Sequence, residues 1–140
     1  MRFFIKILSS IGLALVLGTG AAHAEWVDYS KEAFAQAQKD GRTQLVDISA
    51  DWCPTCRAQK PILDELATED RLGNVVFVKL DYDTHKDFLR TYNVPRQSTI
   101  LIFDGATEVN RSIAETDRER LRSFVFESVD QITPSDRSDG

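Results

Sequence analysis

The stretch SADWCPTCRAQKP, residues 49–61, contains both cysteines of the 140-residue chain, Cys53 and Cys56. Two thiols at this spacing can close a disulfide, or they can supply two soft ligands to a metal ion. A disulfide between them encloses a very short loop, so it constrains the unfolded chain little and contributes little stability. The spacing therefore favours a chemical role for the pair over a structural one.

The C-x-x-C spacing allows the two cysteines to meet at the first turn of a helix. Cys53 would lie at the helix N-terminus, where free N–H groups and the positive end of the helix dipole favour a thiolate. Cys56 would lie one turn further in, more buried, and could attack a mixed disulfide on Cys53. The pair is predicted to be redox active, with Cys53 as nucleophile and Cys56 as resolving cysteine.

A metal site is the alternative use of these thiols. Structural zinc takes four ligands, whereas Cys56 and Cys53 supply two, and His85 is the single histidine after residue 24. A complete Cys/His zinc site within one chain is excluded, and no metal ligand is assigned. Transient binding of copper by the two thiolates is an alternative, although the composition favours redox exchange.

Residues 1–24 have the layout of a secretory signal peptide. Arg2 and Lys6 precede an apolar run of about 11 residues, and a small–x–small pattern ends at Ala24. This layout predicts cleavage after Ala24 and export to an oxidising compartment. The alternative is a retained membrane anchor, but the run is short against the ~20 residues of a membrane-spanning helix.

The charge of the remaining chain is acidic. Without Arg2 and Lys6 there are 15 Lys and Arg against 22 Asp and Glu, a net charge of −7 rather than −5 with histidines neutral. Dispersed acidic charge lacks the basic patch of a nucleic-acid-binding protein, so no nucleic-acid partner is expected. Nothing in the sequence indicates an oligomer, and a monomer is expected.

Residues 25–132 are predicted to form one domain, followed by a polar, frayed tail over residues 133–140. Ser30 can cap the first helix, Pro61 should kink the second, and Thr116 with Glu119 forms a capping box before the last. The order of elements predicts an α/β sandwich with a mixed central sheet. Helices are expected over residues 28–41, 53–70, 85–94 and 120–129, and strands over 43–49, 74–83, 98–105 and 107–113.

The segment LVDISADWCPTCRAQKPILDEL, residues 45–66, resembles the active-site segment of the thioredoxin family. Trp52 stands before the first cysteine and Pro61 lies five residues after the second, as in that family. The order of elements over residues 26–132 is similar as well. The resemblance implies a thioredoxin-like fold, thiol–disulfide oxidoreductase activity at a redox-active disulfide, and no organic cofactor.

Asp47 is a candidate general base. A carboxyl in a core strand loses hydration, which raises its pKa toward neutrality, while a nearby Lys79 would oppose the rise. A carboxyl of this kind can accept the proton that Cys56 loses when it attacks the mixed disulfide, directly or through a water. The resemblance places the family's buried strand acid at Asp47 and its frequent lysine partner at Lys79. The alternative is that Asp47 only terminates a strand.

The family has a cis-proline before its third strand, facing the cysteines. Matching YNVPRQSTILIF, residues 92–103, to that pattern puts Ser98 at this position, with Pro95 three residues too early. The Gln97–Ser98 peptide is then either trans in an altered loop, or cis at a cost of about 3 kcal/mol. In the family the backbone there pairs with an extended substrate segment, a form of strand addition. The resemblance therefore implies that Gln97 and Ser98 bind substrate with added side-chain hydrogen bonds, or hold a ligand. The alternative is neutral drift in a loop that still works. Trp52 either shields the disulfide and offers a flat contact surface for substrate, or is an ordinary packing tryptophan.

Pro54 and Thr55 separate the cysteines. They differ from the Gly-Pro of cytosolic thioredoxins and from the Pro-His of strong periplasmic oxidases. Without a histidine at Thr55 the thiolate is less stabilised and the disulfide less oxidising. With Asp47 and Lys79 this favours a periplasmic reductase of client-protein disulfides, fed by a membrane thiol–disulfide carrier. The alternatives are a disulfide oxidase or isomerase, or a copper- or client-binding module that uses the same thiols.

Overall fold

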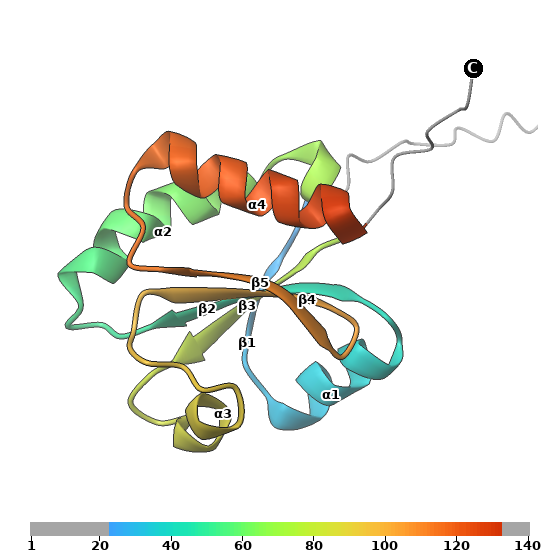
Figure 1. Ribbon diagram of the computed structural model, residues 1–140, viewed down its shortest axis with the longest axis horizontal. Coiled ribbons are helices and arrows are strands. Elements are labelled where there is room, and N and C mark those ends of the chain that lie inside the picture. Colours follow the sequence, from blue (N-terminus) through green and yellow to red (C-terminus); the bar gives the residue numbers. More distant parts are fainter. Residues whose placement is uncertain (1–22, 133–140) are drawn as a thin grey trace, which may run out of the picture.

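The computed structural model describes residues 23–132. Most of the expected signal peptide, residues 1–22, and the expected tail, residues 133–140, lie outside this range. A central sheet carries helices on both faces (Figure 1). In chain order the elements are β1 (Trp26–Asp28), α1 (Lys31–Lys39), β2 (Thr43–Ser49), α2 (Pro54–Ala67), the 3₁₀ helix η1 (Asp70–Leu72), β3 (Val76–Asp81), α3 (Lys86–Thr91), β4 (Thr99–Asp104), β5 (Thr107–Ile113) and α4 (Arg118–Ile132).

The five strands form one mixed sheet in the order β1-β3-β2-β4-β5. The β1, β3 and β2 strands are parallel, whereas β4 and β5 are antiparallel to their neighbours. The register places Asp47 on β2 between Lys79 on β3 and Ile100 on β4. Central strands covered on both faces read as nearly continuous apolar runs, and this pattern predicted a central position for β3. The predicted α/β sandwich with a mixed sheet is confirmed.

Each face of the sheet has its own core, because neighbouring residues of a strand point to opposite sides. Leu45 packs under α2 and α4, while Val46 packs with α1 and α3 on the other face. Figure 1 shows α2 with α4 above the sheet and α1 with α3 below it. Leu63 of α2 and Leu121 of α4 are fully buried in the first core, and Phe34 of α1 anchors the second.

The sequence predicted α1 to α4 and β2 to β5 with ends within three residues of those observed, whereas η1 was not predicted. Ser30 caps α1 as predicted, since its hydroxyl accepts from the Ala33 N–H at 3.1 Å. The predicted capping box before α4 is wrong: the Asp117 carboxylate accepts from the Arg120 N–H at 2.9 Å instead. Strand β1 was not predicted, because three residues are too few to show an alternating pattern and the strand depends on pairing with β3.

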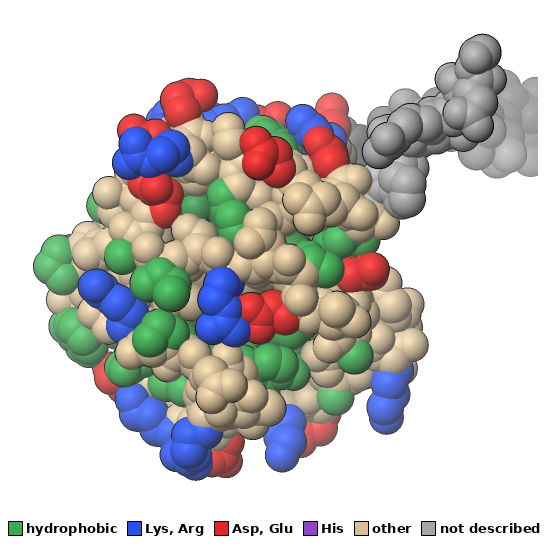
Figure 2. Space-filling view, in the orientation of Figure 1, with side chains coloured by type: hydrophobic (Ala, Val, Ile, Leu, Met, Phe, Trp, Pro, Cys, Tyr) green, Lys and Arg blue, Asp and Glu red, His purple; other side chains and the backbone are tan. Residues whose placement is uncertain are grey.

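The surface carries acidic and basic side chains interspersed over the face shown in Figure 2. The large hydrophobic side chains that are most exposed among residues 23–132 are Val27, Trp52 and Ile113. Within the same residues, no helix combines the length and the apolar character needed to cross a membrane.

The buried position of Leu63 predicts a large effect of truncation on stability. Leu63 is 0% exposed, so Leu63→Ala should leave a cavity and lower the free energy of unfolding by about 2–5 kcal/mol. Ile113→Ala is the matched control, because Ile113 is 46% exposed and should lose about 1 kcal/mol or less. Urea denaturation followed by circular dichroism measures both, and equal losses would contradict the assignment of the core.

Candidate active site

Cys53 and Cys56 form a disulfide at the start of α2. Cys53 is the N-cap residue of the helix, and its Sγ accepts a hydrogen bond from the Cys56 N–H at 3.1 Å. Pro54 follows at the first helical position, where a proline loses no helical hydrogen bond, and Thr55 completes the turn. The pair therefore lies at the positive end of a helix of 14 residues, where a thiolate is favoured.

The exposure of the two sulfurs is the reverse of the sequence expectation. Cys53 is 0% exposed and Cys56 is 7% exposed, although Cys56 was expected to be the more buried. Both cysteines are buried, and Ser98 lies against both sulfurs.

Ser98 contacts both sulfurs. Its Oγ lies 3.2 Å from Cys53 Sγ and 3.0 Å from Cys56 Sγ. No cis peptide occurs within residues 23–132, so the Gln97–Ser98 bond is trans, and Ser98 has a φ of 62°. A left-handed conformation is uncommon for a residue other than glycine. Gln97 is half-buried beside it, and the substrate-binding role of both residues stays a prediction.

Gln59 supports the Ser98 loop, and the sequence analysis did not identify it. Its Nε2 donates to the Ser98 carbonyl at 3.4 Å and to the Glu115 carbonyl at 2.8 Å. The side chain is 1% exposed. Gln59 lies three residues after Cys56, and this spacing puts both on the same face of α2, which is the sequence signal that could have identified it.

Asp47 has the shifted pKa that the sequence predicted. Its Oδ1 is buried and has no hydrogen-bond partner among the described residues. Burial raises the pKa of Asp47 to about 7, while Lys79 and Lys60 act in the opposite direction. At neutral pH such a carboxyl can both accept and return a proton. Its role as the base for Cys56 stays a prediction.

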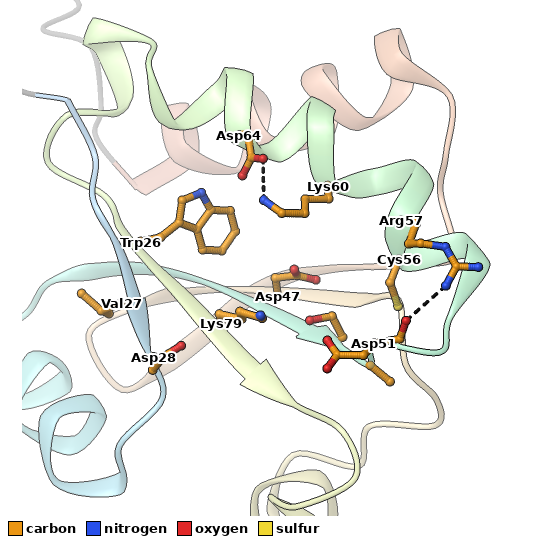
Figure 3. A pocket seen from close by; sticks show the side chains of 12 residues that line it. Trp26, Val27, Asp28, Asp47, Asp51, Cys56, Arg57, Lys60, Asp64 and Lys79 are labelled. Carbon is orange, nitrogen blue, oxygen red and sulfur yellow. Dashed lines mark hydrogen bonds and ion pairs between the residues drawn. The ribbon is translucent and has the colours of Figure 1, made fainter.

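A pocket of about 480 Å³ joins the carboxyl to the redox pair. Asp47 and Cys56 both line it, and Figure 3 shows Lys79 from the neighbouring strand and Lys60 from α2 around the carboxyl. The pocket has room for water, which can bridge polar groups that do not touch. Trp26, to which the sequence analysis gave no function, forms part of the wall.

Trp52 lies on the surface next to the cysteines. Its side chain is 56% exposed, and its Nε1 donates to the Asp83 carboxylate at 2.8 Å. Trp52 therefore lies outside the buried core, and its role in binding substrate stays a prediction. Asp83 follows β3, and nothing in its local sequence connected it with Trp52.

These features together define a class of protein. A disulfide at a helix N-terminus can be opened and closed there, with a hydroxyl against its sulfurs and a carboxyl that titrates near neutrality in the adjoining pocket. Within residues 23–132, no three or more His, Cys, Asp and Glu side chains are grouped as metal ligands. The fold and the site are those of a protein that exchanges dithiols and disulfides.

Comparisons with known proteins identify the family. The sequence model of the Thioredoxin family matches residues 25–127. A thioredoxin of Chlamydia trachomatis serovar D is 34% identical over 96 residues, which cover 69% of this chain and 91% of the relative. The crystal structure of Trxlp from Edwardsiella tarda EIB202 is similar, with 38% identity, a TM-score of 0.69, and coverage of 71% of this chain and 97% of that chain. The chain belongs to the thioredoxin family and is a thiol–disulfide oxidoreductase.

Some relatives are much longer than this chain. It spans 21% of a bifunctional thioredoxin reductase/thioredoxin of Mycobacterium leprae. It also spans 26% of a protein disulfide-isomerase of Aspergillus niger, with 26% identity over 136 residues. The similarity to both reductive and isomerising proteins leaves the direction of electron flow open.

The raised pKa of Asp47 predicts a pH-dependent loss of stability. Below about pH 4 the carboxyl is protonated in both states. As the pH rises from there, the unfolded chain releases this proton while the folded protein keeps it until its own pKa of about 7. Ionisation of Asp47 should therefore lower the free energy of unfolding by roughly 4 kcal/mol, fully expressed above neutral pH.

Asp47→Asn should remove this dependence. Urea denaturation of the oxidised protein across this pH range measures it, and the variant should become more stable than the wild type as the pH rises. A constant difference between the two proteins at all pH values would show that Asp47 does not titrate near neutrality.

Proposed function

We propose that this chain is an exported reductase of disulfides in client proteins, acting in a bacterial periplasm as a monomer after cleavage near Ala24. The observation that carries the proposal is the Cys53–Cys56 disulfide at the N-terminus of α2, next to Asp47 with a pKa of about 7. Thioredoxin-family proteins act on substrates that contain disulfides. The export step rests on the pattern of residues 1–24.

The chemistry follows from the order of the two sulfurs. The Cys53 thiolate attacks a client disulfide, forms a mixed disulfide and releases one client sulfur as a thiolate. Cys56 then loses its proton to Asp47 through water in the pocket, and its thiolate attacks Cys53 Sγ. The Cys53–Cys56 bond forms, the second client thiolate leaves, and two electrons have passed to the client.

The proposed direction rests on the residues around the thiols. Thr55 supplies no charge to stabilise the Cys53 thiolate, and a less stabilised thiolate makes a less oxidising disulfide. A reductase in an oxidising compartment needs electrons, and a membrane thiol–disulfide carrier is the proposed donor. Oxidation or isomerisation of clients is the second candidate, because a protein disulfide-isomerase matches nearly the whole chain, 96% of it.

The reduction potential of the Cys53–Cys56 pair separates these directions. Equilibration of residues 25–140 in thiol buffers should give a value near about −270 mV, as for thioredoxin, if the protein is a reductase. A value near about −120 mV would make it an oxidant and overturn the proposed direction.

Trapping of mixed disulfides in cells tests both the action on client proteins and the periplasmic location. Expressed as the full chain, Cys56→Ser should accumulate in the periplasmic fraction as mixed disulfides with client proteins, because the resolving thiol is absent. The trapped protein should begin at Glu25 by mass spectrometry. Cys53→Ser is the matched control and should trap no clients. Retention of residues 1–24 would contradict export by cleavage, and equal trapping by both variants would contradict the order of attack.

A further inference from the structure

The hydroxyl of Ser98 touches both reacting sulfurs. We propose that Ser98 is a catalytic residue that donates its O–H to whichever sulfur carries negative charge during exchange. The Oγ lies 3.2 Å from Cys53 Sγ and 3.0 Å from Cys56 Sγ. Within residues 23–132, the two sulfurs are the hydroxyl's hydrogen-bond partners. The inference rests on the exchange reaction proposed above but holds for either direction of electron flow.

Burial makes this contact effective. Cys53 and Ser98 are each 0% exposed, and Cys56 is 7% exposed. Sulfurs joined in a disulfide carry no net charge and accept hydrogen bonds weakly, whereas a thiolate is a charged acceptor. A hydrogen bond to a charged acceptor is roughly twice as strong as a neutral one, and little water competes here. The hydroxyl therefore stabilises the thiolate form of the pair more than the disulfide.

The nearly equal distances let one hydroxyl serve both steps. In the reduced protein the O–H donates to the Cys53 thiolate. Once Cys53 is held in a mixed disulfide, the charge passes to Cys56 as it loses its proton, and the same O–H turns to Cys56 Sγ. Ser98 keeps its own proton throughout. The bond to the client breaks, the Cys53–Cys56 bond forms, and the client leaves as a thiolate.

The backbone of Ser98 is held in place by three segments. Its N–H donates to the Ile48 carbonyl at 2.8 Å, and its carbonyl accepts from the Ala114 N–H at 2.8 Å. Gln59, on the same helix as the cysteines, donates to that carbonyl at 3.4 Å. These bonds fix the left-handed φ of 62° that turns the side chain onto the sulfurs. Gln59 thus acts as a positioning residue for the hydroxyl.

Two variants separate the hydroxyl from the backbone. Ser98→Ala removes the hydroxyl and keeps the strained φ, whereas Ser98→Gly removes both the hydroxyl and the strain. The thiolate fraction of Cys53 is measured from ultraviolet absorbance and the alkylation rate of the reduced protein over a range of pH. Both variants should lower the acid dissociation constant of the Cys53 thiol about tenfold, from the loss of a hydrogen bond to a charged group.

The equilibrium with glutathione gives a second readout. At a pH where Cys53 of the reduced protein is ionised, both variants should shift it about tenfold toward the protein disulfide, which corresponds to about 30 mV in the reducing direction. An unchanged thiolate fraction and equilibrium in both variants would overturn the proposal. So would a change in Ser98→Ala that Ser98→Gly restores to wild-type values, because strain and not the hydroxyl would then be responsible.

The measurement is independent of the proposed client reduction. Titration and glutathione equilibrium need no client, no membrane donor and no export. A tenfold shift in both variants supports the role of Ser98, whether or not the wild-type protein reduces a client disulfide. Failure of the wild-type protein to reduce a client would contradict the reductase function alone. If the wild-type protein reduces clients but both variants titrate as the wild type does, only the role of Ser98 is contradicted.

Discussion

The hydrogen bond from the Ser98 N–H to the Ile48 carbonyl, 2.8 Å long, is the contact on which the site depends. It continues the pairing of β2 with β4 beyond Thr99, so the loop before β4 is held against the end of β2. The same end of β2 leads into the turn that carries Cys53. Because both segments are fixed to one strand, the hydroxyl of Ser98 and the sulfur of Cys53 meet without any direct bond between their backbones.

The site controls charge in two different ways. Burial raises the pKa of Asp47 to about 7, so at neutral pH part of the carboxyl is ionised and can accept a proton. The sulfurs are buried as well, but donors surround them: the Cys56 N–H and the Ser98 hydroxyl both reach Cys53 Sγ. A negative charge is therefore costly on the carboxyl and supported on the sulfurs, and this difference would favour the proposed proton transfer from Cys56 to Asp47.

Two influences on the redox properties oppose each other. Thr55 gives the Cys53 thiolate no neighbouring charge, which favours a reducing pair, while a donating Ser98 would favour the thiolate and a more oxidising pair. The relatives include thioredoxins and a protein disulfide-isomerase, which is consistent with a site that small changes can move in either direction. Trp52, whose Nε1 donates to Asp83 at 2.8 Å, leaves an exposed aromatic surface beside the pair.

The sequence alone determined the features that depend on local spacing. The C-x-x-C pair at a helix start, the apolar strand around Asp47 and the raised pKa of that carboxyl all follow from neighbouring residues. The tertiary structure decided which distant residues join them. Ser98 lies 45 and 42 positions from the cysteines, and its left-handed backbone and its position against both sulfurs depend on contacts with β2 and with Gln59. Such contacts form only when the chain packs, because no local pattern specifies where a loop will lie.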